Sequence, residues 1–426
     1  MAVEFKLVFV EMGQGDCCMA RCPDGEIFVI DCGSKANKYG DPDAEIVAKV
    51  MLRDKDWAGG NSNKVNALIL THPDADHHNK VVSFFDETQI LSDITVPSTG
   101  KVIKKSKIPK IKIDEIYFSN SYTDDSPLGN YGDGLLNLYV YSDHFETNRI
   151  YEITINNETD AKNKYKTWHK SSCFKTLAGT GPIENKRFVI RSGTTKGKEW
   201  RVSIIAGNVP NGYKGVKDAA SEENAKSLVT LFEIEGKKAL LCGDMTLSTE
   251  KFLRDNHKAL LTSIELVQIP HHGSDNASAM GTVTMLNPKA AVVSVGFIEH
   301  SHRLPRHEAV LDRWIDEIGM RAKIVAHDID YWSTKNEKSK DITYADIQKK
   351  YNEWTKNGAD QSGVFRTDSK YFLCLAQPFP GVYGYYTLID RGFFLYRERL
   401  VANLTMTSQK TQVYTLDENG VTYKDA

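Results

Sequence analysis

"THPDADHH" fills residues 71–78 and follows directly on the apolar run Asn66-Ala-Leu-Ile-Leu70. A short apolar run of this kind predicts a buried strand. Such a strand holds the residues that follow it at a fixed position. Two aspartates and three histidines occur in this stretch. That many metal-binding side chains exceed what a solvated loop needs, although an Asp-rich loop also occurs as a turn or a helix cap. The stretch therefore predicts a metal site at the end of a strand.

The spacing of these side chains predicts how they converge. Written with its gaps, the stretch is His72-x-Asp74-x-Asp76-His77. Residues two apart in an extended segment point the same way, so His72, Asp74 and Asp76 face one side. His77 then turns in from the next bend. Two ligands are thereby offered to each of two ions, and a pair of ions roughly 3.5–4 Å apart activates water and clamps a phosphoryl or acyl oxygen.

Two later strand ends carry further candidate ligands. "KALLCGD" (238–244) places Asp244 behind an apolar run, and "LVQIPHHGS" (266–274) ends another run with His271 and His272. Open α/β folds bind their ligands at the carboxyl ends of strands, where such residues meet. Taken singly, Asp244 is also compatible with a bare turn, and the histidine pair with a packed core pair. Three such strand ends in one chain favour a shared metal centre.

Composition excludes several classes of protein. The 426 residues leave room for about two to three domains or for a single large α/β domain with insertions. Of these residues 41% are apolar, and the net charge is -2, so no global basic field indicates nucleic acid. The first residues have the pattern of a strand and lack that of a signal peptide, which predicts a cytoplasmic protein. No apolar run approaches the roughly 18 residues that a membrane span needs. The seven cysteines are odd in number, which favours reduced core thiols.

Periodicity along the chain predicts alternating strands and helices. The turn Pro23-Asp24-Gly25 between Cys17–Arg21 and Glu26–Ile30 predicts a hairpin, and residues 43–54 have helical periodicity. The chain is expected to divide into a core (1–97 and 199–370), an insertion or cap (98–198) and a β-rich extension (371–426). Further expected elements are strands at Phe5–Glu11, Leu135–Tyr141, Trp200–Ala206, Ser227–Glu235, Lys238–Cys242, Ser263–Ile269 and Ala290–Val295, and helices at His307–Ile318 and Thr343–Trp354.

Several motifs together carry a family resemblance. They resemble the metallo-β-lactamase fold and, more narrowly, the hydrolase domain of the DNA-uptake competence protein ComEC and its stand-alone relatives. The resemblance implies an α/β fold, an αββα sandwich, with the insertion and the C-terminal extension added to it. The similar stretches cover about half of residues 1–370 and are "MGQGDCCMARCPDGEIFVIDCG" (12–33), "ALILTHPDADH" (67–77), "NAKSLVTLFEIEGKKALLCGD" (224–244), "VQIPHHGS" (267–274), "AVVSVG" (291–296) and "VFRTD" (364–368).

The resemblance also implies a set of site residues. One or two divalent ions, zinc or manganese, would be held by these side chains, and Asp16 and Asp31 would orient the ligand imidazoles. Asp76, His272 and His302 are the expected catalytic residues. His72 and Asp74 would hold the first ion, Asp76 and His77 the second, Asp244 would bridge the two, and His271 or His272 would complete the second.

The chain departs from the pattern of the superfamily at two places. Asp74 stands where most members have histidine, and the histidines between 78 and 244 are His144 and His169, neither of which matches the usual ligand. Fewer imidazoles and more carboxylates shift the preference from zinc toward manganese. After Val295-Gly296, ComEC-like sequences read Gly-His-Pro, whereas here His302 is the candidate proton donor, or else a surface histidine.

The function expected from these features is that of a metal-dependent hydrolase, a phosphodiesterase or nuclease that acts on DNA or RNA through a metal-activated water. Six lysines in residues 101–112, with Tyr117, Phe118 and Tyr122 nearby, suit a single strand, although lysine runs are commonly solvated edges. Two alternatives stay open. One is a hydrolase of a small ester, thioester or cyclic nucleotide; the other is a catalytically idle, partner-binding component of a bacterial defence or uptake system. No membrane partner is expected, and the sequence names no protein partner.

Overall fold

The structure of the chain is a computed structural model. It describes residues 2–10, 12, 15–34, 64–85, 88–89, 94–95, 102–103, 107–108, 111–119, 128, 131, 149–169, 176–179, 183–262, 264–294, 313–314, 323–327, 364–367, 371–374, 395–396, 404–407 and 412–425.

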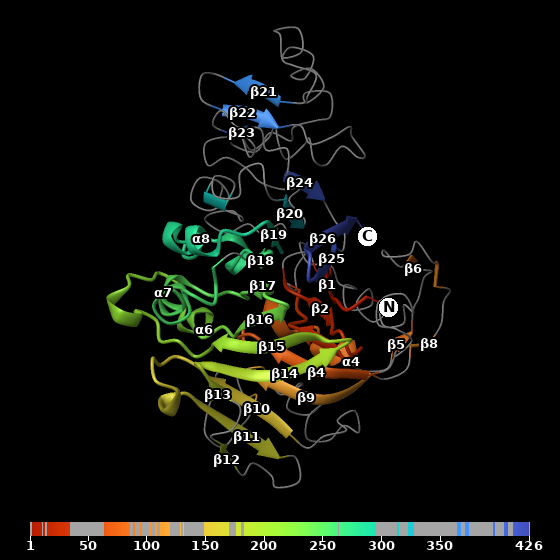
Figure 1. Cartoon of the computed structure of the whole chain (residues 1–426), viewed down its shortest axis with the longest axis vertical. Helices are drawn as coiled ribbons and strands as arrows, with labels where there is room; N and C mark the ends of the chain where they lie inside the picture. The colour runs from red at the N-terminus through yellow and green to blue at the C-terminus, as the bar shows by residue number, and fades with distance from the viewer. Residues whose placement is uncertain are drawn as a thin grey trace.

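Two large sheets dominate the described residues (Figure 1). In spatial order the first consists of β12 (Thr176–Gly179), β11 (Lys164–His169), β10 (Arg149–Thr154), β9 (Lys112–Phe118), β4 (Lys64–Leu70), β3 (Ile27–Ile30), β2 (Cys18–Arg21), β1 (Phe5–Phe9), β25 (Gln412–Asp417) and β26 (Gly420–Asp425). The second consists of β13 (Ile183–Glu184), β14 (Arg187–Thr195), β15 (Lys198–Ala206), β16 (Val229–Ile234), β17 (Lys237–Leu241), β18 (Leu266–Gln268), β19 (Ala290–Val293), β20 (Lys323–His327) and β24 (Leu404–Thr407).

Smaller elements complete the described part of the chain. The remaining strands are β21 (Val364–Thr367), β22 (Tyr371–Cys374) and β23 (Leu395–Tyr396) in one sheet, β5 (Thr88–Gln89) with β8 (Lys107–Ile108), and β6 (Ile94–Thr95) with β7 (Val102–Ile103). The helices are α3 (Ala75–His78), α4 (Val81–Phe85), α6 (Glu222–Ala225), α7 (Leu247–Asn256) and α8 (Met280–Leu286), with short 3₁₀ turns at Asp160–Lys162, Tyr213–Gly215 and His271–Gly273. No helix among these residues is long and apolar enough to cross a membrane.

The position of strand β4 explains why residues 67–70 are apolar without interruption. It lies between β3 and β9, parallel to both, and both of its faces are covered. Ala67 and Ile69 belong to the core between the two sheets, whereas Leu68 and Leu70 pack in the layer that includes α4. A parallel strand buried on both faces needs apolar residues at successive positions. This burial explains the apolar run in front of residue 71.

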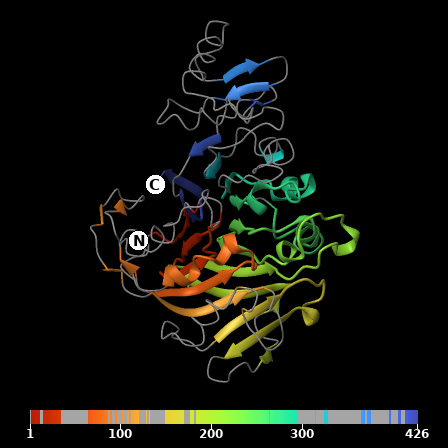
Figure 2. The same ribbon diagram turned by 180° about the vertical axis from the view of Figure 1, so that it is seen from behind.

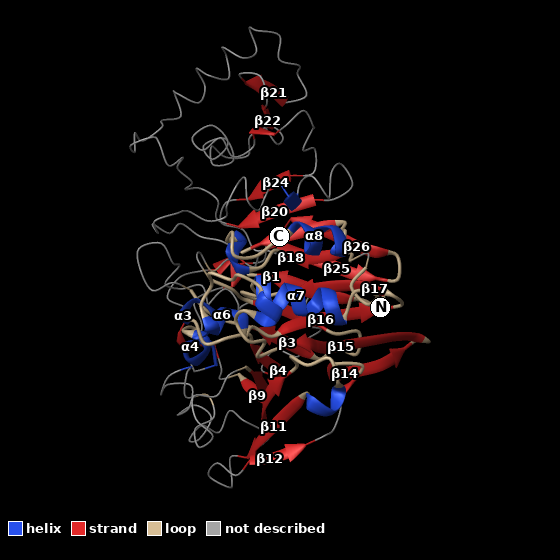
Figure 3. Cartoon of the chain, turned by 90° about the vertical axis from the view of Figure 1, so that its left-hand side faces the viewer, coloured by secondary structure: helices blue, strands red, loops and turns tan. Residues whose placement is uncertain are grey.

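Helices cover the outer faces of both sheets. Phe84 and Phe85 of α4 pack on the first sheet, and Figure 2 shows this helix on its outer side. Phe252 of α7 and Val283 of α8 pack with the second sheet, which Figure 3 shows behind α7. The layers therefore run helix, sheet, sheet, helix, and the αββα sandwich predicted from the sequence is confirmed.

Most of the strands expected for the core are present with shifts of one to three residues at their ends. The hairpin predicted at Pro23-Asp24-Gly25 joins β2 to β3, and Gly25 adopts the positive φ of 95° that such a turn requires. The expected helix at 43–54, strand at Leu135–Tyr141 and helix at Thr343–Trp354 lie outside the described residues. Of the expected helix His307–Ile318, only Arg313 and Trp314 are described, and both are helical.

The division into core, insertion and extension stays a prediction. Strands β9, β10, β11 and β12 of the segment 98–198 nevertheless extend the first sheet, and β14 pairs with β15 in the second. Strand β25 of the C-terminal segment pairs antiparallel with β1, Phe5 opposite Leu416. These described strands are thus continuous with the two main sheets.

Candidate metal centre

The stretch 71–78 leaves β4 as a short extended segment and then becomes helix α3. Asp74 is the N-cap with extended backbone, and His77 N–H donates to the Asp74 carbonyl at 2.9 Å. The sequence predicted an extended loop through Asp76, but Asp76 and His77 lie on the first turn of α3. The Asp74 side chain makes no capping hydrogen bond, and backbone contacts from the first sheet hold the turn instead: Asp16 N–H donates to the Asp76 carbonyl at 3.0 Å, and Cys32 N–H to the His77 carbonyl at 2.8 Å. The turn moves His77 inward, where its ring is fully buried.

Asp31 fixes the orientation of His77. It follows β3 with a left-handed backbone, φ 56°. Its carboxylate accepts from Thr71 N–H at 2.8 Å and Thr71 Oγ1 at 2.6 Å, and lies 2.8 Å from His77 Nδ1. With Nδ1 bonded to a carboxylate, Nε2 is the ring nitrogen left to face the centre. Burial lowers the pKa of His77, but the Asp244 and Asp31 carboxylates outweigh burial and hold this pKa well above its ordinary value.

Asp244 reaches the same point from the second sheet. It follows β17 through Gly243, whose φ is 49° and whose missing side chain leaves room for Thr71: a Cβ there would lie 2.9 Å from Thr71 Cβ. The Asp244 side chain is almost fully buried. Burial raises its pKa, but the histidines around it, His272 foremost, bring the pKa well below its ordinary value. A buried carboxylate held ionised in this way is suited to bind a cation.

The adjacent histidines 271 and 272 follow β18 in a strained turn. Both have left-handed backbone, φ 50° and φ 49°. Non-glycine residues rarely adopt this conformation, and it persists where the surroundings hold it for function. His272 Nδ1 donates to the Ser294 carbonyl at 2.7 Å, so its Nε2 faces the centre. His271 N–H donates to the Gly243 carbonyl at 3.0 Å, which ties this turn to the loop of Asp244.

The side chains form two groups, one at each oxygen of Asp244. Oδ1 lies 3.1 Å from His77 Nε2 and 3.5 Å from His272 Nε2. Asp76 Oδ2 lies 3.6 Å from the same His272 nitrogen. Around the other oxygen, Oδ2, are His271 Nε2 at 3.6 Å and His72 Nε2 at 3.8 Å. Asp74 Oδ2 is 3.6 Å from His72 Nε2. The arrangement is that of a carboxylate shared between two sets of donors.

These distances fit metal ligation better than hydrogen bonding. A tetrahedral ion with bonds of about 2.1 Å separates its ligand atoms by about 3.4 Å. One ligand atom each from Asp16, His77, Asp244 and His272 can be chosen so that all lie within 4.8 Å of one another. A buried polar atom without a partner costs about 1–3 kcal/mol, which a bound divalent cation would offset. The buried atoms without a hydrogen-bond partner in this cluster are Asp16 Oδ1, His72 Nε2, His77 Nε2, Asp244 Oδ1 and His272 Nε2. The residues present therefore fit a divalent ion.

Two expected residues need separate description. Asp16 lies 3.8 Å from His77 Nδ1, too far for the orienting hydrogen bond, which Asp31 makes instead. Asp16 is buried and faces the centre with an unpaired oxygen. His302, the expected proton donor, lies outside the described residues.

Sequence reasoning missed three residues that support the centre. Thr71 holds Asp31, Ser294 holds His272, and Asn224 places its side-chain Nδ2 2.9 Å from His271 Nε2. Asn224 comes from α6, which Figure 3 shows near α3 at the same edge of the sandwich. A lone serine, threonine or asparagine carries no metal-ligand pattern, so nothing in the sequence marked these positions.

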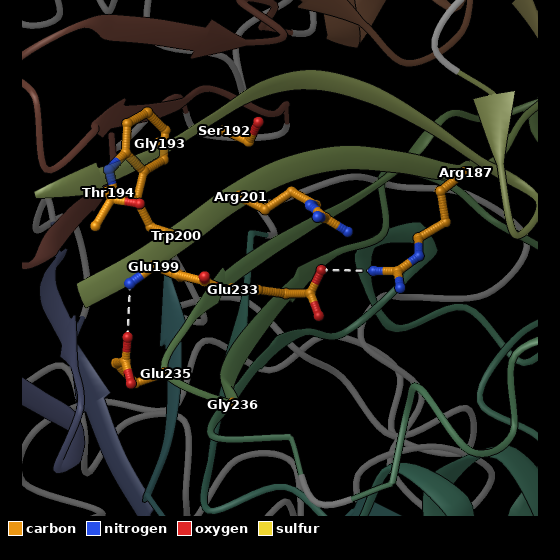
Figure 4. A pocket seen from close by; sticks show the side chains of 10 residues that line it. All are labelled: Arg187, Ser192, Gly193, Thr194, Glu199, Trp200, Arg201, Glu233, Glu235 and Gly236. Atoms are coloured by element: carbon orange, nitrogen blue, oxygen red, sulfur yellow. Dashed lines mark hydrogen bonds and ion pairs between the residues drawn. The ribbon is translucent and has the colours of Figure 1, made fainter. Parts of the chain in front are cut away.

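A pocket elsewhere on the second sheet carries no comparable chemistry (Figure 4). It measures about 590 Å³ and includes Gly236, at the end of β17 opposite to Asp244. Three of its charged side chains have partners: Arg187 pairs with Glu233 at 2.8 Å, and the Glu235 carboxylate accepts from the Glu199 backbone N–H at 2.6 Å. The full lining consists of Arg187, Ser192, Gly193, Thr194, Glu199, Trp200, Arg201, Glu233, Glu235 and Gly236.

No family profile matches this chain, and no curated protein matches it. Among solved structures, the short form of human tRNase Z is 12% identical with a TM-score of 0.37, covering 68% of this chain and 92% of its own. The metallo-β-lactamase fold protein YhfI from Bacillus subtilis is 9% identical with a TM-score of 0.34, and the match covers 76% of this chain and 96% of YhfI. A long form RNase Z from yeast is 11% identical with a TM-score of 0.33, and the match covers 76% of this chain and 41% of the yeast protein. The narrower resemblance to ComEC stays a prediction, and the assignment of the centre rests on the geometry of the chain's own residues.

Proposed function

We propose that the protein is a divalent-metal-dependent hydrolase that cleaves phosphodiester bonds, a nuclease acting on DNA or RNA inside the cell. The observation that carries the proposal is the position of Asp244. Both oxygens of this buried carboxylate face histidine nitrogens, and the Nε2 atoms of His72, His77 and His272 have no hydrogen-bond partner. Such a shared carboxylate is what a centre for two ions requires.

The charge of the site makes the reaction depend on metal. Five carboxylates, from Asp16, Asp31, Asp74, Asp76 and Asp244, surround three buried histidine rings. A phosphodiester carries a negative charge, so the bare site would repel it. When bound, divalent ions supply the positive charge, polarise the phosphoryl oxygen and lower the pKa of water. With its high share of oxygen donors, this set favours manganese and also accepts zinc.

The chain's own residues supply orientation and proton transfer. Asp31 and the Ser294 carbonyl hold the Nδ1 atoms of His77 and His272, so each presents Nε2 to the centre. The side chain of Asp76 is 18% exposed and lies beside His272, which gives it access both to the centre and to water. We assign Asp76 as the group that accepts the proton of the attacking water. His302 is proposed as the donor to the leaving group.

The test is hydrolysis of bis(p-nitrophenyl) phosphate and of labelled single-stranded DNA and RNA by metal-stripped protein. Manganese, zinc or magnesium is added back to the native chain, to Asp244→Asn and to the control Asp24→Asn, which alters an exposed turn. We expect metal to restore cleavage in the native chain and the control. Asp244→Asn should lower the rate by at least about a hundredfold.

Two outcomes would contradict the proposal. Hydrolysis of a carboxylic ester, a thioester or a cyclic nucleotide without cleavage of nucleic acid would make the protein a small-molecule hydrolase. No bound metal and no hydrolysis under any condition would leave a partner-binding protein that has kept the fold.

A further inference from the structure

The first ion site lacks a histidine in the sequence. His72 and Asp74 offer one imidazole and one carboxylate, and the histidines between 78 and 244 are His144 and His169. His169 ends β11, which is separated from β4 by β9 and β10. Strands in a sheet are about 4.8 Å apart, so this position is at least about 14 Å from β4. His144 lies outside the described residues.

We propose that His271 supplies the missing imidazole, so that the two adjacent histidines serve two different ions. His72, Asp74, His271 and Asp244 Oδ2 would hold the first ion; Asp76, His77, His272 and Asp244 Oδ1 would hold the second. The proposal rests on the metal dependence of the proposed function and goes beyond it, because the sequence assigned His271 or His272 to the second ion alone.

The positions of the ring nitrogens separate the two histidines. His271 Nε2 lies 3.6 Å from Asp244 Oδ2, the oxygen that His72 approaches at 3.8 Å, whereas His272 Nε2 lies 3.5 Å from Oδ1. The two rings diverge, with centroids 6.4 Å apart and planes at 70°. Adjacent residues of a regular helix or strand would not place both rings on one carboxylate. The two consecutive left-handed residues do so.

Asn224 prepares His271 for this role. Its amide nitrogen lies 2.9 Å from His271 Nε2 and donates to it, which keeps the proton of a neutral imidazole on Nδ1. Nε2 is thus unprotonated, as a metal ligand must be. An ion at the first site would replace the Asn224 amide as the partner of this nitrogen.

The two sets have similar ligands but different exposure. Each has two imidazoles, one carboxylate of its own and one oxygen of Asp244, and Asp16 also lies beside the second set. The first set is more open: the side chains of Asp74 and His271 are 42% and 16% exposed, against 18% and 3% for Asp76 and His272. Water competes more strongly for exposed donors, so we expect the second site to fill first and the first site to bind more weakly.

The test counts ions bound to the full-length, metal-stripped protein by equilibrium dialysis against manganese with elemental analysis. The variants are His271→Asn and His272→Asn, with His271→Gly as a second substitution. Asparagine and glycine both tolerate a positive φ, so the turn is preserved. Asp24→Asn, in an exposed turn, serves as the control. Electron paramagnetic resonance of the manganese-loaded proteins reports whether two ions lie close enough to couple magnetically.

We expect two ions in the native chain and in Asp24→Asn, with a spin-coupled signal. His271→Asn and His271→Gly should lose the weaker ion and the coupling but keep the tighter one. Loss of a group that only orients a ligand costs about 10–100-fold in affinity, so loss of a direct ligand should cost at least about 100-fold. His272→Asn should instead weaken the tighter ion.

Two results would overturn the inference: two coupled ions at native affinity in both His271 variants, or a single ion in the native chain that loss of His271 leaves unchanged. The outcome is independent of hydrolysis. A protein with two coupled ions and no activity on nucleic acid would refute the proposed function and leave this assignment intact.

Discussion

Asp31 orients a histidine of the centre through one carboxylate oxygen. Its Oδ2 accepts from Thr71 and lies 2.8 Å from His77 Nδ1. Asp31→Asn replaces one carboxylate oxygen with an amide that can only donate, and asparagine tolerates the φ of 56°. An N–H facing Nδ1 moves the ring proton to Nε2, the nitrogen that should bind metal. We expect manganese affinity at the second site to fall about 10–100-fold, measured by competition with a chelator.

The affinity of the first ion serves as the internal control for this prediction. The weaker, first ion should be less affected in Asp31→Asn, because Asp31 reaches its ligand His72 only through the Thr71 hydroxyl, which lies 3.1 Å from His72 Nδ1. Unchanged affinity at both sites would show that His77 needs no carboxylate partner.

His257 makes stability depend on pH. It is 4% exposed at the end of α7, and burial, with Lys186 and Arg187 nearby, lowers its pKa from 6.5 to about 4. As the pH falls through 6.5 the unfolded chain takes up a proton that the folded chain refuses, so stability decreases until about pH 4. This loss should reach at most about 3 kcal/mol.

Urea unfolding of His257→Gln and the native chain at pH 7 and pH 5 measures this dependence. Every other ionisable group is the same in both proteins, so the difference in slope isolates His257. We expect a shallower loss in the variant. Equal loss in the two proteins would place the acid sensitivity elsewhere.

The sequence predicted the residues of the centre better than their partners. His72, Asp74, Asp76 and His77 stand together in one short stretch, and their spacing is local information. The partner of His271, in contrast, depends on a left-handed turn and on a helix almost fifty residues earlier, α6. Neither the turn nor that proximity has a signature in the sequence. Whether each of these side chains binds metal remains a prediction.

At the scale of elements, the close approach of the ligand loop to the hairpin strands depends on Gly33. A Cβ at this position would lie 2.3 Å from the Asp76 carbonyl carbon and 2.4 Å from His77 N. Both atoms are backbone, so Gly33→Ala must displace the start of α3. We expect a loss of about 3 kcal/mol in unfolding free energy, together with weaker metal binding.

Gly281→Ala is the matched control for this substitution. Its Cβ would meet only the flexible Arg254 side chain at 3.7 Å, and alanine favours the helix α8. Thermal unfolding of the two variants should therefore shift in opposite directions. A Gly33→Ala protein as stable as the native chain would mean that the loop moves freely.

The sequence predicted those strands in which both faces, or every second residue, are buried. Strand β3 is apolar throughout, β4, β16 and β17 contain shorter apolar runs beside polar residues, and all four lie inside the sheets. Strands β10 and β11 were missed, because their sequences mix lysine, threonine and tyrosine near the edge of the first sheet. An outer strand buries less surface and so leaves a weaker pattern.

For the whole molecule, metal should act as a clamp between the two sheets. His77 and Asp31 come from the first sheet, and Asp244 and His272 from the second. An ion that binds only the folded arrangement stabilises it, by about 2.7 kcal/mol at a concentration one hundred times its dissociation constant. We expect chelation to lower the thermal midpoint of the native chain and added manganese to restore it.

Asp244→Asn removes the shared carboxylate and should make the thermal midpoint insensitive to chelator and to manganese. If the variant still responded as the native chain does, the stabilising ion would be bound somewhere other than this centre.

The pairing of β1 with β25 has a consequence for synthesis. The two strands lie side by side in the first sheet, yet they are roughly 400 residues apart in the chain. While the protein is being made, β1 leaves the ribosome long before its partner exists. The hydrogen-bonding edge of β1 that β25 covers stays unpaired through most of translation. Three of its residues, Phe5, Leu7 and Phe9, belong to the core of the folded protein. At about 5–20 residues per second, this wait lasts from about twenty to eighty seconds. A chaperone that shields an exposed strand edge during that interval would govern how much of the newly made chain reaches the native state.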